Sequence, residues 1–325
     1  MKHFLFEFIT GGGLSGQTLP NSLVSEGRIM VKTILNELIS CGYSDVTITK
    51  DHRIELFSKN IFEHTINTPL EEILPDLIKK SNFSWLIAPE TDGQLYNLTK
   101  LFIKNSNIFI GSDIHAVKIS SSKFTTCNTL KNANITTPKT FFLNKKIPDS
   151  NTGWIIKPDD GVGAENCMYI RDRCQLEKKV LEKKYDNYVI QPFINGEHMS
   201  ICLFVYNNNI QLLSCNKQEI KIQNNLIKLN NIIVNGYLMY ANKMRELATE
   251  IVSVIPGLSG HVGIDLIKFN NRFFVLDINP RFTTSYSGLS SSLGFNVTEK
   301  LVEIFLREKM QDISLRKAIP IKLKL

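Results

Sequence analysis

The 325-residue sequence has no long uncharged apolar run, and none approaches the roughly 18 residues that a membrane span requires. Its six cysteines include no Cys-x-x-Cys pair, and its six histidines are never four residues apart. These absences argue against a zinc site and against a disulfide framework. The segment from Met1 to Glu7 contains an acidic residue where a signal peptide needs an apolar core, so no signal peptide is expected. We therefore expect a soluble cytoplasmic protein with reduced thiols.

Charge of one sign is not concentrated in any part of the chain. Lys and Arg number 38 against 31 Asp and Glu, a net charge of +7, with no arginine-rich block or basic stripe. Neither a nucleic-acid nor a membrane partner is therefore expected, whereas acidic small molecules such as nucleotides and amino acids fit this balance. The length predicts about two domains of roughly 150 residues each.

The first third of the chain predicts a small parallel α/β domain. An apolar run from Phe4 to Ile9 leads into the glycine loop Gly11–Gly13, and apolar residues at helical spacing follow from Leu23 to Leu38. This order opens a β-α-β unit. Further strands are expected at 46–49, 85–88 and 108–110, with a helix at 95–105. The glycine loop is either a tight turn or part of a substrate site, and the sequence leaves both open.

Beyond Gly111 the pattern predicts an α+β region of antiparallel sheets. A helical stretch from Ile114 to Leu130 is expected to open it. Strands are expected at 140–143, 154–157, 168–170, 188–191, 201–206, 210–214, 226–234, 262–269 and 272–278, with helices at 175–184 and 243–254.

The segment from Trp154 to Glu165 is a candidate phosphate site. The expected strand delivers Lys157, and a turn that contains Gly161 and Gly163 follows it. Glycines let backbone N–H groups approach phosphate oxygens, and a lysine on a strand supplies a fixed positive charge. The lysine precedes the glycines, so this is not a Walker loop. An ordinary hairpin turn would explain the segment as well.

The segment from Tyr188 to Glu197 offers groups that suit a nucleoside. A purine needs hydrogen bonds at one edge, apolar groups on its faces and an acceptor for its ribose hydroxyls. The residues that would supply these, in order along the chain, are Gln191, Pro192, Phe193, Ile194 and Glu197. On its own, the segment is better explained as a buried strand that runs into a turn.

A late hairpin suggests a metal site. A three-residue loop at Asn270–Arg272 would place Asp265 opposite Asp277, with Asn279 on the same face. The other pairs of this register are Phe269 with Phe273 and Ile267 with Val275, whereas a two-residue loop would oppose Asp265 with Leu276. Like charges directly opposite destabilise a sheet, and Mg²⁺ takes carboxylate oxygens that it shares with substrate phosphates. We therefore expect a divalent cation here, with two solvated acids as the alternative.

Together with Lys123, which follows the expected N-cap Ser122, these pieces resemble the ATP-grasp superfamily of carboxylate–amine ligases. The resemblance extends from Phe4 to about Leu306. Alone, Lys123 would be taken as a surface lysine. Lys123 and Lys157 match the nucleotide-binding lysines of the family, and Gly161 and Gly163 match its glycine flap. The segment from Gln191 to Ile194 matches the adenine hinge. The ligands of Mg²⁺ or Mn²⁺ are matched by Asp265, Asp277 and Asn279. Arg281 matches the arginine that commonly meets the acyl phosphate or the substrate carboxylate, and Lys217 matches a further phosphate-contacting lysine.

The chain departs from the family pattern at three of these places. Ser122 stands where many relatives have aspartate, and Asp277 stands where glutamate is common. The ribose-binding acid of many relatives sits one residue later, where this chain has His198. Glu197 is therefore a substitute for that acid.

The resemblance implies an N-terminal pre-ATP-grasp domain at 1–112, a small ATP-grasp lobe at 113–193 and a large lobe with the metal site at 194–325. It also implies an ATP- and Mg²⁺-dependent ligase. The substrate carboxylate would attack the γ-phosphate while Lys157 and Lys217 hold the phosphates. An amine would then displace phosphate from the acyl phosphate, with Arg281 stabilising the developing charge.

The segments Phe6–Leu14, Leu19–Gly27 and Asn279–Leu289 more particularly resemble the ATP-grasp proteins of the methanofuran pathway, which are related to tyramine–L-glutamate ligase. They imply glutamate and an amine such as tyramine as small-molecule substrates. An ATP-grasp ligase for another acid–amine pair and a non-catalytic nucleotide-binding regulator remain as alternatives. The metal ligands and Arg281 argue against the regulator. The oligomeric state, including a homodimer, stays open.

Overall fold

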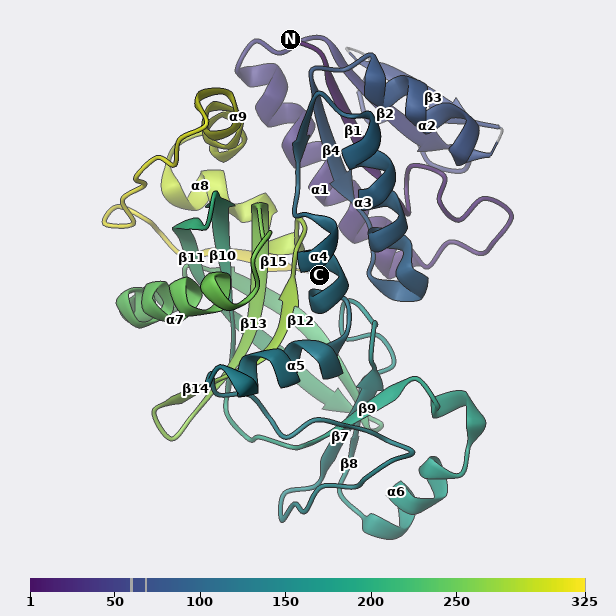
Figure 1. The fold of residues 1–325 in the computed structure, drawn as a ribbon, viewed down its shortest axis with the longest axis vertical. Coiled ribbons are helices and arrows are strands. Elements are labelled where there is room, and N and C mark those ends of the chain that lie inside the picture. The colour runs from purple at the N-terminus through teal and green to yellow at the C-terminus, as the bar shows by residue number, and fades with distance from the viewer. Residues whose placement is uncertain (59–60, 68, 325) are drawn as a thin grey trace.

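The computed structural model describes residues 1–58, 61–67 and 69–324, and these residues fold around two β-sheets (Figure 1). The purple and blue part at the top of Figure 1 contains the N-terminal sheet. The green and yellow part below it contains most of the second sheet, and the teal strands at the bottom complete that sheet.

The N-terminal sheet is parallel and has the strand order β3-β2-β1-β4-β5. Its strands are β1 (His3–Glu7), β2 (Val46–Asp51), β3 (Phe62–Ile66), β4 (Phe83–Ile87) and β5 (Ile108–Ile110). Its helices are α1 (Asn21–Ser40), α2 (Leu70–Lys79) and α3 (Gln94–Asn105). The order reverses between β1 and β4, and ligands of such sheets bind beyond the carboxyl ends of the strands at this point.

The parallel α/β domain predicted from the sequence is confirmed, with two elements that the pattern does not predict. In β3, Phe62 is exposed, so the strand lacks a clear apolar face. In α2, Pro75 lies inside the helix, and proline usually breaks a helix because it lacks a backbone N–H. Both elements form because they contact the rest of the parallel domain. Local sequence does not reveal these long-range contacts.

The helical stretch predicted from Ile114 to Leu130 consists of two helices. These are α4 (Ile114–Ser120) and α5 (Lys123–Asn132). Ser122 lies between them as the predicted N-cap of α5, and its hydroxyl accepts a hydrogen bond from the Thr125 backbone N–H at 3.0 Å. The break brings Lys123 to the first turn of α5, where it is buried.

The second sheet has ten strands in the order β14-β13-β10-β11-β12-β8-β7-β9-β6, and β15 pairs with β12 outside this path. Its larger part contains β10 (Glu197–Tyr206), β11 (Asn209–Gln223), β12 (Leu226–Val234), β13 (Gly260–Phe269), β14 (Arg272–Asn279) and β15 (Ile321–Lys324). Its smaller part contains β6 (Phe141–Phe142), β7 (Trp154–Pro158), β8 (Met168–Ile170) and β9 (Tyr188–Pro192), with α6 (Arg173–Val180) beside them. The remaining helices are α7 (Ala241–Val254), α8 (Leu289–Leu293) and α9 (Val297–Arg307).

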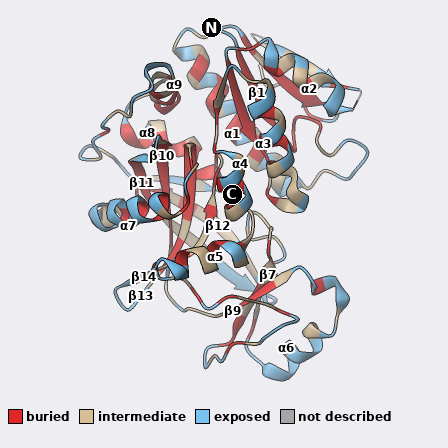
Figure 2. Ribbon diagram, viewed as in Figure 1, coloured by how far each residue is buried: buried red, intermediate tan, exposed pale blue. Residues whose placement is uncertain are grey.

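Buried apolar side chains cover both faces of β10, as the red strands of Figure 2 indicate. Met199, Ile201 and Leu203 pack in one cluster with α7 residues. Cys202 and Phe204 point to the opposite face and pack in a cluster that includes α1, α9 and the N-terminal sheet. The N-terminal domain therefore closes one face of the second sheet. Among the described residues, no helix has the length and apolar character needed to cross a membrane.

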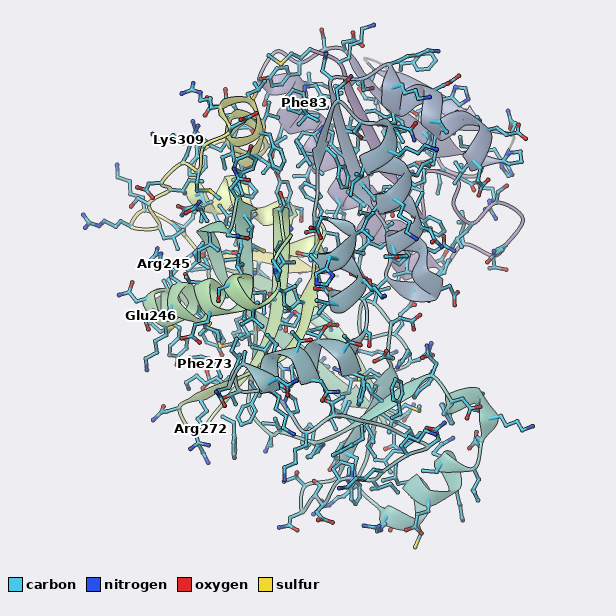
Figure 3. The ribbon with its side chains drawn as sticks, in the orientation of Figure 1. Phe83, Arg245, Glu246, Arg272, Phe273 and Lys309 are labelled. Atoms are coloured by element: carbon cyan, nitrogen blue, oxygen red, sulfur yellow. The ribbon has the colours of Figure 1, made fainter. Side chains whose placement is uncertain are left out.

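Three hairpins of the second sheet turn on consecutive asparagines. The turns are Asn207–Asn208, Asn224–Asn225 and Asn270–Asn271, and all six residues have φ between 47° and 63°. Type I′ turns require positive φ at both central positions, and asparagine tolerates this conformation. The three-residue loop predicted at Asn270–Arg272 is therefore wrong, and Phe269 pairs with Arg272 across a two-residue loop. Figure 3 labels Arg272 at this outer end of the hairpin.

We expect Asn271→Ala to lower the free energy of unfolding by about 1 kcal/mol, because alanine loses the side chain that favours a left-handed residue. Asn271→Gly should preserve or increase stability, since glycine adopts positive φ without a steric penalty. Urea unfolding of the two variants and the unchanged protein measures the difference. Equal stability of the alanine and glycine variants would contradict this account of the turn.

A buried ion pair joins the N-terminal domain to the second sheet. Arg281, just beyond β14, donates from Nε to Glu90 Oε1 and from Nη2 to Glu90 Oε2, both at 2.9 Å. Glu90 lies in the loop after β4, and the two side chains are only 12% and 6% exposed. A bidentate pair fixes both distance and orientation. It therefore aligns the carboxyl end of β4 with the end of β14.

We expect Arg281→Met to lower the free energy of unfolding by about 3–5 kcal/mol, because it leaves the Glu90 carboxylate buried without its partner. In the double variant with Glu90→Gln no charge is left uncompensated, so its loss should be much smaller than the sum of the single losses. A double-mutant cycle in urea measures the coupling. Additive losses would show that the pair does not couple the two domains energetically.

Candidate active site

Two cavities meet between the sheets. One, which we call the lysine cavity, is lined by residues that include Lys123, Lys157, the turn 161–165, the segment 191–194 and Asp277. The other, the glutamate cavity, lies at the carboxyl ends of β1 and β4 and is lined by residues that include Glu7, Glu26 and Arg281. Six residues line both cavities: Val162, Gly163, Gln218, Leu229, Asp265 and Asn279. The two spaces therefore adjoin at one place, where the glycine turn and the late hairpin both contribute.

The two lysines of the lysine cavity differ in their surroundings. Lys123 Nζ donates to the carbonyl oxygen of Gly161 at 2.6 Å and lies 3.3 Å from Asp277 Oδ2. Burial opposes its charge, but the carboxylates of Asp277 and Glu90 raise its pKa overall. Lys157 lies on β7 and forms no ion pair within the described chain. Burial lowers the pKa of His198, and the positive charge of Lys157 lowers it further. Because no carboxylate of the described chain pairs with Lys157, its charge is available to bind an anion.

The glycine turn is held from several sides. Asp159 anchors its start, because its carbonyl oxygen accepts from the Lys123 backbone N–H at 3.0 Å and its Oδ1 from the Phe124 N–H at 2.8 Å. Asp160 Oδ2 accepts from the backbone N–H of Asp92 in the N-terminal domain at 2.9 Å. Gly163 has φ +60°, a conformation that glycine adopts without strain. The turn therefore lies over the junction of the two cavities.

The predicted adenine hinge lines the lysine cavity, but the Gln191 amide is already bonded. Its Nε2 donates to Thr140 Oγ1 at 2.9 Å, and the residue is only 3% exposed. Pro192, Phe193 and Ile194 also line the cavity. Phe193 packs against Tyr169, with ring centroids 4.6 Å apart. Gln191 therefore shapes the wall, and the apolar residues after it offer a face for a flat ring.

Asp265 and Asp277 face each other across β13 and β14, although the route to this register differs from the prediction. The two-residue loop sets Ile267 opposite Phe274 and Leu266 opposite Val275. A β-bulge then places Leu276 as an extra residue, so that Asp265 pairs with Asp277 after all. A bulge turns successive side chains toward one side, and both Leu276 and Asp277 line the lysine cavity.

The two facing carboxylates repel each other, so their charges are unfavourable without a cation. Burial raises the pKa of Asp265, and the Asp277 carboxylate raises it further. Two amides partly compensate, because Gln218 Nε2 donates to Asp265 Oδ1 at 2.8 Å and Asn279 Nδ2 donates to Asp265 Oδ2 at 3.0 Å. Carboxylate and amide oxygens are hard donors that suit Mg²⁺. The donor set of Asp265, Asp277 and Asn279 therefore fits a divalent cation.

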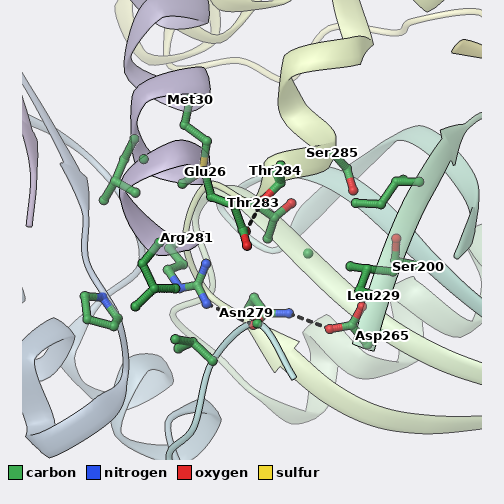
Figure 4. Close-up of a pocket in the computed structure, with 18 of the residues that line it drawn as sticks. Glu26, Met30, Ser200, Leu229, Asp265, Asn279, Arg281, Thr283, Thr284 and Ser285 are labelled. Carbon is green, nitrogen blue, oxygen red and sulfur yellow. Dashed lines mark hydrogen bonds between the residues drawn. The ribbon is translucent and has the colours of Figure 1, made fainter. Parts of the chain in front are cut away.

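Figure 4 shows the glutamate cavity, with Arg281 and Asn279 on one side and Glu26 and Thr284 on another. Arg281 Nη2 lies 3.4 Å from Asn279 Oδ1, so the arginine is linked to the Asp265 end of the site. Burial opposes its charge, but the carboxylates of Glu90, Asp277 and Glu26 raise its pKa overall. Arg281 therefore stays charged where the two cavities meet.

Two predicted site residues lie away from both cavities. Lys217 and Glu197 belong to strands whose alternate side chains point to opposite faces. Their neighbours Gln218 and His198 line the lysine cavity instead. Glu197 is exposed and forms an ion pair with Lys268 at 2.7 Å. In each strand it is the next residue along the chain that lines the cavity. A motif does not reveal which face of a strand is turned toward the cavity.

Several residues of the site were not among the predicted site residues, although Glu7 and Glu26 lie in the segments Phe6–Leu14 and Leu19–Gly27 that carry the more particular resemblance. Glu7, Glu26 and Glu90 come from the N-terminal domain and reach the site through the packing of the two sheets. Gln218 could have been found by testing both faces of its strand. The loop Gly11–Gly13 lines neither cavity, and Gly11 N–H instead closes a turn onto the Glu7 carbonyl oxygen at 2.7 Å. It serves here as the tight turn.

Models of two known domain families match this chain. A model of the ATP-grasp domain matches residues 120–285, more than half of the chain, and a model of the pre ATP-grasp 3 domain matches residues 44–117. The chain is 28% identical over 299 residues to tyramine–L-glutamate ligase of Methanocaldococcus jannaschii, covering 88% of this chain and 84% of that protein. The corresponding ligase of Methanocaldococcus fervens is also 28% identical, over 295 residues and 88% of each chain.

Solved structures share the fold at lower identity. An ATP-grasp superfamily protein from Archaeoglobus fulgidus has a TM-score of 0.73 and 22% identity, covering 100% of this chain and 99% of that one. The L-amino acid ligase of Bacillus licheniformis has a TM-score of 0.69 and 16% identity, covering 94% and 74%. The predicted fold and the predicted enzyme class, a ligase that forms C–N bonds, are confirmed. This chain therefore belongs to the ATP-grasp family of ligases.

Proposed function

We propose that the chain joins a carboxylate to an amine through an acyl phosphate, with L-glutamate and tyramine as its substrates. The observation that carries this proposal is the junction of the two cavities at Asp265 and Asn279. One cavity offers lysines and a glycine turn, which suit a nucleotide's phosphates. The other adjoins it closely enough for a carboxylate to approach the terminal phosphate.

In the lysine cavity, Lys157 and the backbone of the glycine turn would hold the ATP phosphates. Lys157 has no partner within the described chain to compete for its charge. Gly161 and Gly163 would let the backbone approach phosphate oxygens. Phe193 and Ile194 would pack on adenine, and His198, which lines this cavity whereas Glu197 does not, would lie beside the ribose. Lys123 would keep the turn in place through its bond to Gly161.

Asp265, Asp277 and Asn279 would hold Mg²⁺ or Mn²⁺. When bound, such an ion neutralises phosphate charge and keeps the reacting phosphate in line. Gln218 would hold the Asp265 carboxylate toward this position through its 2.8 Å hydrogen bond. The Asn279 amide, which donates to Asp265 in this structure, presents its oxygen to a cation after a rotation of its side chain.

Arg281 would act where the acyl group forms. A substrate carboxylate that attacks the γ-phosphate displaces ADP and gives an acyl phosphate. An amine that attacks the acyl carbon then displaces phosphate and loses a proton to complete the amide. Negative charge grows on the acyl oxygen in the second step, and a preorganised donor stabilises it. Glu90 holds Arg281 in a fixed orientation for this purpose, so Glu90 would be a positioning residue.

The substrate pair rests on the curated relatives. Both are named for tyramine and L-glutamate, and this chain matches them over 88% of its length. We therefore propose the same pair, in a methanofuran-type cofactor synthesis. A second candidate is another amino acid and amine pair, because an L-amino acid ligase shares the fold over 94% of this chain.

We also propose domain boundaries and a compartment. The N-terminal domain would comprise residues 1–112, the small lobe 113–193 and the large lobe 194–325. The free cysteines of the described chain and the use of ATP fit a cytoplasmic enzyme.

A substrate panel tests the proposed function. We expect phosphate release from ATP and Mg²⁺ when L-glutamate and tyramine are both present, with mass spectrometry detecting their amide. The panel pairs L-glutamate and other amino acids with tyramine and other primary amines. Product from a different pair only would favour the second candidate. ATP binding without phosphate release in any pairing would favour a nucleotide-binding regulator.

Thermal unfolding tests the metal ligands. We expect ATP with Mg²⁺, at a hundredfold excess over its Kd, to stabilise the protein by about 2.7 kcal/mol, and ATP with a chelator to stabilise it less. Asp277→Asn should lose the Mg²⁺-dependent part, because it removes a charged oxygen ligand. Asp76→Asn, an exposed change of equal charge on α2, is the control. A full Mg²⁺ effect in Asp277→Asn would remove this residue from the metal site.

A further inference from the structure

The Glu26 side chain reaches the glutamate cavity from the first turns of α1. Its Oε2 accepts a hydrogen bond from Thr284 Oγ1 at 2.6 Å, and the dashed line in Figure 4 marks this bond. Its Oε1 lies 3.9 Å from the position that a Cβ on Gly163 would take. Within the described chain, Oε1 has no hydrogen-bond partner and Glu26 forms no ion pair. One carboxylate oxygen is therefore oriented by the protein while the other is free.

No cation of the described residues forms a direct ion pair with Glu26, although the charges of Arg281 and Glu26 attract each other at longer range. Arg281 is the single cation among the described residues that line the cavity, and Glu90 already binds it in a bidentate pair. The other glutamate of the wall, Glu7, has its oxygens bonded by the backbone N–H groups of Ile9 and Thr10 at 3.0 and 2.6 Å. Glu26 is thus the carboxylate that a positively charged ligand can pair with.

Part of the cavity wall is apolar. The residues concerned are Leu23 and Met30 of α1, Ile87 of β4, and Leu229 and Ile232 of β12. Figure 4 shows Met30 beside Glu26, with Leu229 across the space. An unpaired carboxylate beside apolar side chains suits a ligand with a charged ammonium end and an apolar or slender body.

We propose that Glu26 binds the primary ammonium group of a substrate and so selects amines for this enzyme. The inference rests on the proposed function, because it specifies how the same site recognises its second substrate. Glu26 lies next to the glycine turn and across the cavity from Asp265 (Figure 4). An ammonium group held there lies beside the junction where the acyl phosphate is formed. Thr284 is the positioning residue that orients the carboxylate.

Two substrates carry this chemistry. Tyramine has a primary ammonium group attached to an aromatic body, and L-glutamate carries an α-ammonium group. Each would form a charge-assisted hydrogen bond with Glu26 Oε1, and such bonds are stronger than neutral ones. The experiment separates the two by measuring each ligand on its own.

Glu26→Gln tests the inference, because it removes the charge and keeps the shape and the acceptor for Thr284. Isothermal titration calorimetry, with the protein saturated in ADP and Mg²⁺, measures the binding of tyramine, L-glutamate and tyrosol, in which a hydroxyl replaces the amine of tyramine. We expect Kd for tyramine or L-glutamate to rise about 10- to 100-fold in the variant. Tyrosol should bind both proteins alike. Glu71→Gln, an exposed change of equal charge on α2, should bind all three as the unchanged protein does.

The ligand whose Kd rises identifies which ammonium group Glu26 holds. Unchanged Kd values for both ammonium ligands in Glu26→Gln would overturn the inference and leave the proposed function standing. If the unchanged protein binds ADP but neither tyramine nor L-glutamate, both the inference and the proposed substrate pair are wrong. The KM values for tyramine and ATP provide a second readout, since only the KM of an ammonium substrate should rise.

Discussion

The pairing of Asp265 with Asp277 is the constraint on which the site depends. Two carboxylates that face each other in a partly buried hairpin destabilise the fold unless something compensates their charge. The chain surrounds them with Gln218, Asn279 and Lys123, which offset only part of this cost. Under the proposed function, a divalent cation bound at this position would offset the remainder of the cost.

The Arg281–Glu90 pair connects this site to the N-terminal domain. The N-terminal sheet places its switch point, with the ends of β1 and β4, over one face of the second sheet. Without a specific contact the two parts could slide against each other, because apolar packing is non-directional. The bidentate pair fixes their relation, and it keeps the arginine charged beside Asn279. One interaction therefore both joins the domains and orients the arginine that we propose as catalytic.

The structure brings most of the predicted site residues to the two adjoining cavities, and it leaves others away from them for physical reasons. Lys157, Gly163 and Asp265 lie together at one cavity because each follows or belongs to a strand whose end was recognisable. Lys217 and Glu197 point away from it, since a motif does not reveal which face of a strand is turned inward. The Asp265 pairing was predicted through a wrong loop, and a bulge at Leu276 restored the register. Such a bulge depends on neighbouring strands.

Local sequence by itself determined the turns and many of the elements of this protein. Consecutive asparagines adopt positive φ and form tight hairpin turns, and Ser122 begins a helix through its own side chain. Only the tertiary structure decided that Glu26 and Glu90 lie near Arg281, since Glu90 is 191 residues and Glu26 is 255 residues away from it in the chain. Local propensity acts over a few residues, whereas the meeting of distant carboxylates depends on how two sheets bury their apolar faces.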